Sequence, residues 1–161
     1  FGRDTIDGNA GTDRITFSGL TVAVTVTYSG DLAGTFTDGV DSATFSDIEQ
    51  IILTSLSDNV DASASTSQPV DLTLGAGNDT AIGTAFADTI GGGDGDDFID
   101  GGAGNDFLTT GLGNDTLLGG DGDDTLSNSD GNDSLDGGAG GDLLLGDGME
   151  DLPDGFDWGG V

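Results

Sequence analysis

Apolar residues recur every nine positions through the second half of the chain. Residues 74–145 divide into eight consecutive blocks of nine, and the eighth position of every block is apolar. These positions are Ala81, Ile90, Ile99, Leu108, Leu117, Leu126, Leu135 and Leu144. The residues between them are mainly glycine, aspartate and asparagine, which are typical of turns. The pattern predicts short strands joined by turns. Each unit can bury its apolar side chain only by stacking on its neighbours, so the chain should form a solenoid.

Three further positions of the repeat are occupied by aspartate or mostly by glycine. The sixth position is always aspartate: Asp79, Asp88, Asp97, Asp106, Asp115, Asp124, Asp133 and Asp142. The second and fourth positions are mostly glycine, which supplies the φ values that other residues avoid in tight turns. These glycines are Gly75, Gly77, Gly93, Gly95, Gly102, Gly104, Gly111, Gly113, Gly120, Gly122, Gly131, Gly138 and Gly140. An acid and an apolar residue at fixed spacing, eight times over, indicate one repeated structural unit.

Three blocks show the repeat in its fullest form: GGDGDDFID, GGAGNDFLT and GGDGDDTLS. They resemble the nonapeptide GGxGxDxUx, in which U is a large aliphatic residue, of the repeats-in-toxin (RTX) calcium-binding family. A short N-terminal stretch shares the spacing, because Asp4 and Ile6 precede Asp13 and Ile15 by nine residues. The resemblance implies an all-β fold, a right-handed parallel β-roll (a β-helix solenoid) with calcium-binding turns rich in glycine and aspartate.

The resemblance also implies where the ions would lie. In the family two blocks complete one coil, so aspartates on the same edge of the solenoid would be 18 residues apart. Neighbouring coils stand about 4.8 Å apart, and stacked carboxylates at that distance repel each other unless a cation lies between them. Calcium fits because it takes six to eight oxygen ligands in irregular geometry. We therefore expect the sixth-position aspartates and the glycines of the second and fourth positions to bind Ca²⁺. The family pattern gives about six or more ions, and weaker sites are expected at Asp4 and Asp13.

The blocks do not all keep the glycine positions. In GTAFADTIG, Thr84 and Phe86 stand where glycines belong, so the turn before Asp88 should be distorted and its site is the weakest. The opening of NSDGNDSLD is also irregular, with Asn128 and Ser129 in place of glycines. The best-defined sites are expected at Asp97, Asp106, Asp115 and Asp124.

Composition and charge narrow the possible functions. The chain has 31 acidic and two basic residues, a net charge of -29, and only two of the acids are glutamate. Such a charge excludes nucleic acid and anionic membranes as partners, and it opposes the compact state unless cations neutralise it. The chain contains no histidine and no cysteine. This excludes a zinc or copper site and any serine–histidine or HExxH catalytic centre. No apolar run is long enough to span a bilayer.

The rest of the chain divides less clearly. We expect an N-terminal RTX-like turn at 1–15, a degenerate β-solenoid or capping β region at 16–73, the β-roll at 74–145 and a C-terminal cap or linker at 146–161. Within 16–73, the alternating stretch from Thr21 to Tyr28 predicts a strand, and the apolar cluster from Phe45 to Leu53 predicts one or two more. A separate small β-sandwich is the alternative for 16–73.

The sequence favours a binding module over an enzyme. The resemblance implies a secreted or cell-surface bacterial protein, exported by type I secretion, that folds and is stabilised when it binds Ca²⁺ outside the cell. The chain would be a structural or secretion-assisting part of a larger protein, and that protein could itself be an enzyme or a toxin. The alternative is a structural or adhesive component of a surface layer, biofilm or filament. Calcium is the expected partner, and self-association or a cell-surface partner stays open.

Overall fold

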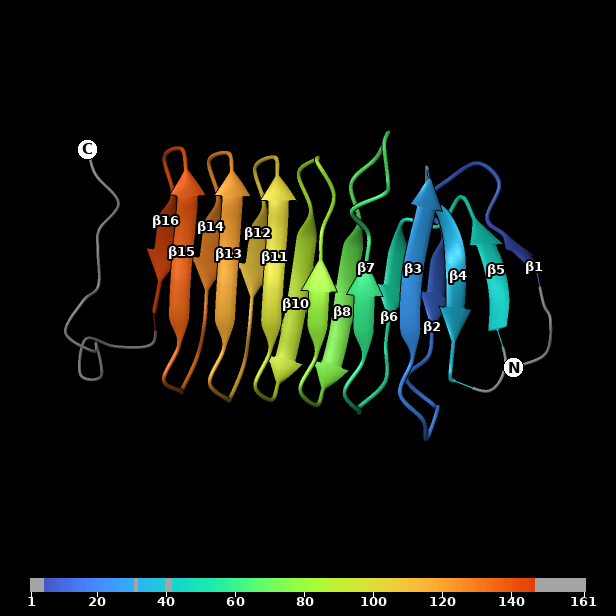
Figure 1. Cartoon of the computed structure of the whole chain (residues 1–161), viewed down its shortest axis with the longest axis horizontal. Coiled ribbons are helices and arrows are strands. Elements are labelled where there is room, and N and C mark those ends of the chain that lie inside the picture. The colour runs from blue at the N-terminus through green and yellow to red at the C-terminus, as the bar shows by residue number, and fades with distance from the viewer. Residues whose placement is uncertain (1–4, 31, 40–41, 147–161) are drawn as a thin grey trace.

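The computed structural model describes residues 5–30, 32–39 and 42–146, and these residues form two long facing sheets (Figure 1). The first sheet contains, in spatial order, β1 (Thr5–Asp7), β5 (Ser42–Ser46), β4 (Ala33–Thr37), β3 (Thr25–Gly30), β7 (Asn59–Asp61), β9 (Thr80–Ile82), β11 (Phe98–Ala103), β13 (Thr116–Asp121) and β15 (Ser134–Ala139). The second sheet contains β16 (Leu143–Leu145), β14 (Thr125–Ser127), β12 (Phe107–Thr109), β10 (Thr89–Asp94), β8 (Asp71–Ala76), β6 (Gln50–Ile52) and β2 (Arg14–Thr16). The described residues contain no helix, and therefore none that is long and apolar enough to cross a membrane.

From β7 to β16 the chain passes alternately between the two sheets and completes five coils. Every strand in this part pairs in parallel with the strand one coil away, as Thr116 of β13 does with Phe98 of β11. The two partners are one coil, or two nonapeptide blocks, apart. The expected all-β parallel β-roll is therefore confirmed, and so is the expectation that two blocks complete one coil.

The strands of the array are in part longer than the repeat predicts. β11 and β13 each have six residues, because the strand continues through the first two glycines of the next block. Pairing of Gly102 with Gly120 across these strands keeps the two coils in register up to the turn. Strand pairing therefore positions the turns as well as the core.

Residues before β7 lie in the same two sheets but include an antiparallel meander. β3, β4 and β5 pair antiparallel, and β5 pairs in parallel with β1. In the second sheet, Ile15 of β2, Ile51 of β6 and Leu72 of β8 stand in register. The strand expected at Thr21–Tyr28 occurs later, since β3 begins at Thr25. Residues 62–70 form the long loop between β7 and β8 (Figure 1).

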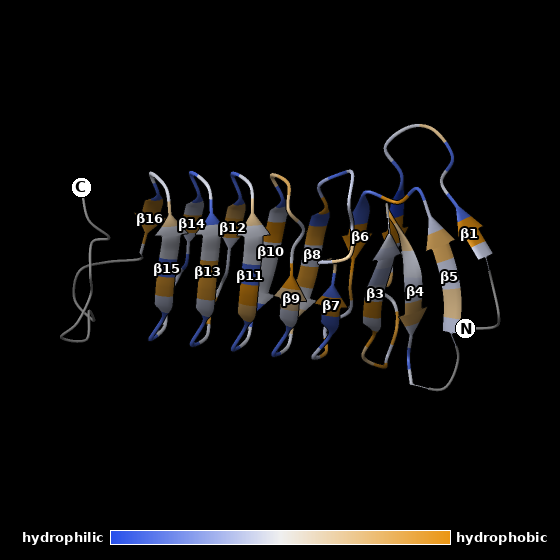
Figure 2. Cartoon of the chain, turned by 45° about the horizontal axis from the view of Figure 1, so that its top comes forward, coloured by the Kyte–Doolittle hydropathy of each residue, from blue (hydrophilic) through white to orange (hydrophobic). Residues whose placement is uncertain are grey.

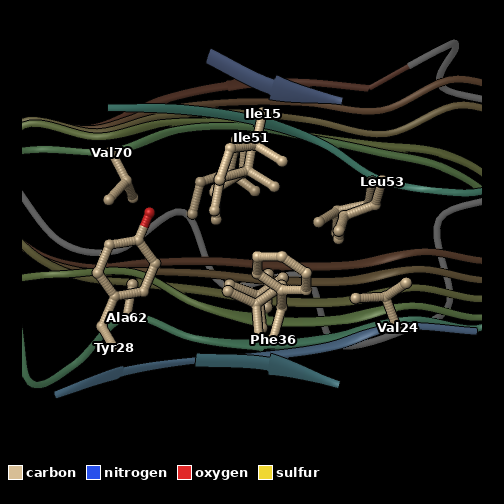
Figure 3. Close-up of a cluster of buried hydrophobic side chains, with 14 of the residues drawn as sticks. Ile15, Val24, Tyr28, Phe36, Ile51, Leu53, Ala62 and Val70 are labelled. Carbon is tan, nitrogen blue, oxygen red and sulfur yellow. The ribbon is translucent and has the colours of Figure 1, made fainter. Parts of the chain in front are cut away.

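The core changes character along the solenoid. In the array it consists of the eighth-position side chains, one per block and alternately from the two sheets, which are fully buried from Ala81 to Leu126 and partly buried at Leu135 and Leu144. In the N-terminal part the core is wider and includes aromatic rings (Figure 3). Phe17 meets Phe36 edge to face at 4.7 Å between ring centroids.

The thin core of the array limits how far apolar burial can stabilise it. A fully buried leucine or isoleucine contributes about 1.5–3 kcal/mol, and each nine-residue block supplies one such side chain. Ordering the backbone opposes folding by about 1–2 kcal/mol per residue. The turns must therefore add stabilisation of their own.

Candidate metal sites

The sixth-position aspartates form two rows, one along each edge of the solenoid where the chain passes from one sheet to the other. The first row contains Asp79, Asp97, Asp115 and Asp133, and it begins one coil earlier with Asp58, which precedes the nonapeptide blocks. The second row contains Asp88, Asp106, Asp124 and Asp142. Figure 2 shows the turns of the array as mostly hydrophilic bends at both edges.

Within a row, each carboxylate accepts a hydrogen bond from the backbone of its neighbour. The N–H of Asp79 donates to Oδ1 of Asp97 at 2.9 Å, and the N–H of Asp88 donates to Oδ1 of Asp106 at 2.8 Å. The same bond recurs in every step of both rows, at 2.7–3.0 Å. One oxygen of each carboxylate is therefore held by the fold.

The second carboxylate oxygen is left without a partner in five of these residues. Oδ2 of each is buried and accepts no hydrogen bond. The five are Asp79, Asp97, Asp106, Asp115 and Asp124. An unsatisfied buried polar group costs about 1–3 kcal/mol, and a charged one costs more. Five such oxygens in regular order indicate positions that a bound cation would complete.

Backbone carbonyl oxygens lie beside these carboxylates where a glycine leaves space. A Cβ built on Gly119 would lie 2.5 Å from Oδ2 of Asp124 and 2.5 Å from the carbonyl oxygen of Gly137. A Cβ on Gly101 would lie 2.4 Å from Oδ2 of Asp106 and 2.9 Å from the carbonyl oxygen of Gly119. Each space is thus lined by a carboxylate of one turn and a carbonyl of the turn one coil later.

The electrostatics of the rows favour a cation. Burial is the main cause that raises the pKa of Asp97 to about 7, and the charges of Asp79 and Asp115 raise it further. Burial likewise raises the pKa of Asp79 and of Asp106 to about 6. Each of these carboxylates also accepts a backbone hydrogen bond that lowers its pKa, and burial outweighs it. The fold therefore holds carboxylates close together in surroundings that disfavour their negative charge.

The family comparison agrees with this geometry. The model of the RTX calcium-binding nonapeptide repeat (4 copies) matches residues 1–19, 73–108, 101–132 and 109–144, which together are more than half of the chain. The chain belongs to the RTX calcium-binding repeat family. Its repeats are therefore calcium-binding repeats. A search of curated proteins gave no match.

The residues of the RTX turns fit calcium chemically. Calcium binds six to eight oxygens at about 2.3–2.6 Å and tolerates irregular arrangements. Within the described part of the chain, no three acidic side chains gather into one cluster. Most ligands would therefore be backbone carbonyls, with one carboxylate oxygen such as Oδ2 of Asp106 or Asp124. Bound calcium would supply the positive charge that these buried oxygens lack.

The predicted ligand glycines fall into two groups. Most have the left-handed φ that the repeat requires, as at Gly93 with φ 103° and Gly95 with φ 133°. The others in this group are Gly75, Gly77, Gly102, Gly104, Gly113, Gly120, Gly122, Gly138 and Gly140. Gly111 and Gly131 have ordinary φ values, and both belong to blocks that open with a residue other than glycine.

Two predicted ligands lie at the ends of the rows. Asp133 is half-buried, and its Oδ2 accepts a hydrogen bond from the side-chain amide of Asn128. Asp142 is half-buried as well, and its Oδ1 accepts the N–H of Asp124 at 3.0 Å. No coil follows them among the described residues, so they lack the next turn that the inner aspartates have.

The weaker N-terminal site is partly described. Oδ2 of Asp13 is buried without a partner, and a Cβ on Gly8 would lie 2.9 Å from it and 2.0 Å from the carbonyl oxygen of Asp47. The N–H of Asp13 donates to Oε2 of Glu49 at 2.7 Å, so Glu49 takes the place that aspartate has in the array. Sequence reasoning missed Glu49, although it is one of only two glutamates. Asp4 lies outside the described residues, as do 147–161 of the expected cap or linker.

Proposed function

We propose that this chain is an extracellular calcium-dependent folding module, a structural or secretion-assisting part of a larger secreted protein. The observation that carries the proposal is the set of five buried carboxylate oxygens without hydrogen-bond donors, spaced one coil apart along two edges. Such a set destabilises the fold without cations and stabilises it with them. Catalysis is no part of this proposal.

Without calcium, the negative charge of the array opposes its folding. The net charge of -29 repels itself, and each unsatisfied oxygen lowers stability further. Binding to the folded state alone contributes RT ln(1 + [Ca²⁺]/Kd) for each ion, about 2.7 kcal/mol at 100 times the Kd. Several ions bound at this strength contribute about as much as the 5–15 kcal/mol by which a typical domain is stable.

The secretion role follows from this calcium dependence. A chain that stays open where free calcium is scarce can pass through a type I export channel, and it folds where calcium is plentiful. Metal binding then supplies the free energy of folding. The proposed division is an N-terminal RTX-like turn at 1–15, a degenerate β-solenoid or capping β region at 16–73 and the calcium array at 74–145. Residues 146–161 are proposed to cap the array or link it onward.

A calcium titration of the purified chain tests the proposal. Far-ultraviolet circular dichroism in EGTA should show little β-structure from the array, and millimolar CaCl₂ should restore it cooperatively. MgCl₂ at the same concentration is the control, because Mg²⁺ demands regular octahedral geometry and gives up its water reluctantly. An identical spectrum in EGTA and in calcium would refute calcium-dependent folding.

A structural or adhesive role is the second candidate, favoured by apolar side chains on the outer faces of the sheets. Phe107 is 48% exposed and Leu143 is 51% exposed on the second sheet, two strands apart, and Phe98 is exposed on the first sheet. Such side chains can bind a second copy or a surface component. Sedimentation of the calcium-loaded chain should then show concentration-dependent association that Phe107→Thr reduces.

A further inference from the structure

In one turn of the second row, both carboxylate oxygens of the aspartate accept hydrogen bonds from other groups of the protein. The N–H of Thr84 donates to Oδ2 of Asp88 at 2.6 Å, and the Thr84 hydroxyl donates to Oδ1 at 2.9 Å. The same hydroxyl accepts the N–H of Phe86 at 3.0 Å. Oδ1 also accepts the N–H of Val70. Asp88 is 2% exposed, yet both of its oxygens have donors.

The first row contains the same arrangement at Asp58. The N–H and the hydroxyl of Thr54 both donate to Oδ2 of Asp58 at 2.8 Å, and Oδ1 accepts the N–H of Val24. The Thr54 hydroxyl accepts the N–H of Leu56, as that of Thr84 does in the other turn. In both turns a threonine precedes the aspartate by four residues, and a large apolar residue lies midway between them. We call this arrangement the threonine clasp.

The clasped turns differ from the array turns in backbone as well as in side chains. Most array turns have left-handed glycines at the second and fourth positions, as at Gly102 and Gly104, whereas neither the threonine nor the apolar residue of a clasped turn has a positive φ. Figure 2 also shows the turn between β9 and β10 as apolar, whereas the turns that follow it along the same edge are mostly hydrophilic. The two turns therefore share a conformation of their own and are not merely distorted copies of the repeat.

We propose that the clasped turns 53–58 and 83–88 hold no calcium, and that a threonine replaces the cation in each. The inference rests on the proposed calcium binding of the other turns. A carboxylate that already receives hydrogen bonds on both oxygens gains little from an ion, and the Thr84 N–H points at the oxygen that would bind it. Asp88, expected from the sequence as a ligand, is thereby assigned to the structural frame.

The proposal fixes how many ions the array binds. Pairing neighbouring aspartates of residues 74–145 along each row gives three intervals per edge. Five of the six intervals begin with an aspartate whose Oδ2 lacks a donor, and the interval from Asp88 to Asp106 does not. The array should therefore bind five ions, one fewer than the repeat count predicts. Any ion at the Asp13 site adds to this number.

Counting bound calcium by native mass spectrometry of the full chain tests the proposal. Asp88→Asn should bind as many ions as the wild type. Asp106→Asn, the same substitution one coil later in the same row, should bind one ion fewer. The double variant Thr84→Gly with Phe86→Gly restores the glycine pattern of the repeat, and it should bind one ion more.

The outcomes separate the two proposals. Loss of an ion in Asp88→Asn would overturn the clasp, and so would an unchanged count in the Thr84→Gly, Phe86→Gly variant. If Asp88→Asn does not fold, which circular dichroism in calcium will show, the double variant decides. If the wild type binds no calcium at all, the proposed function fails instead.

Discussion

Asp106→Asn should stabilise the protein without calcium and destabilise it with calcium. Oδ1 of Asp106 accepts the N–H of Asp88 at 2.8 Å, whereas Oδ2 is buried without a donor. Asparagine has the same shape as aspartate. It keeps the hydrogen bond from the N–H of Asp88 when its side-chain carbonyl oxygen occupies the Oδ1 position. Its amide nitrogen then takes the Oδ2 position, in the space that the carbonyl oxygen of Gly119 also lines. The substitution therefore replaces an unsatisfied acceptor, Oδ2, with an N–H donor close to the carbonyl oxygen of Gly119. It also removes the carboxylate that would bind calcium.

The two effects have different magnitudes. Removing the unsatisfied charged oxygen should raise the unfolding free energy in EGTA by about 1–3 kcal/mol. Losing one ion at calcium 1,000 times the Kd removes about 4.1 kcal/mol. The calcium-loaded variant should therefore be less stable than wild type by about 1–3 kcal/mol.

A urea titration in calcium and an osmolyte titration in EGTA measure the predicted loss and the predicted gain of stability. Urea unfolding followed by circular dichroism gives the stability in calcium. Trimethylamine N-oxide, which favours compact states, gives the folding midpoint in EGTA. Asp121→Asn removes the same charge from an exposed position outside the rows and should change either value by no more than about 0.5 kcal/mol. Equal destabilisation of Asp106→Asn with and without calcium would refute the reasoning, because the carboxylate would then be stabilised by the protein itself.

Three further predictions concern pH, ligand space and core. Since burial raises the pKa of Asp97 to about 7 in the folded state, the calcium-free fold should gain stability as the pH falls through 7 toward 4. It should lose that stability again on return to pH 8, and a midpoint in trimethylamine N-oxide that does not move with pH would contradict this. Gly119→Ala places a methyl group 2.5 Å from Oδ2 of Asp124 and should weaken calcium binding at least tenfold by calorimetry. The control is Gly19→Ala, where nothing lies within 4 Å of the added Cβ. Leu108→Ala empties a fully buried position and should lower the urea-derived stability in calcium by about 2–5 kcal/mol.

The repeat made much of the fold predictable. A strict period places equal side chains at equal positions in every coil, so the pairing of Phe98 with Thr116 and the burial of Leu108 and Leu117 follow from counting. The antiparallel meander of β3, β4 and β5 could not be predicted in the same way. Its register depends on two local reversals of the chain, and no period in the sequence records them.

The candidate sites were predictable only in part. Sequence position identifies the eight aspartates of residues 74–145, but it does not tell whether Oδ2 has a donor. Thr84 departs from the glycine pattern of the sequence, and its hydrogen bonds give that departure a physical role. A signal for the clasp was present, because LTSLSD and GTAFAD share a threonine, a large apolar residue and an aspartate at the same spacing.

The distribution of satisfied and unsatisfied carboxylates follows from position in the rows. Asp58 and Asp88 are the N-terminal members of their rows, and each is closed by a threonine. Asp133 and Asp142 are the last members, and no described coil follows them to supply the facing carbonyls. Every aspartate between these ends has a turn after it and no donor on Oδ2. A cation between coils requires oxygens from two successive turns, so it can act only inside a row. At the start of each row the backbone N–H of Val24 or Val70, in place of that of an aspartate, donates to the first carboxylate.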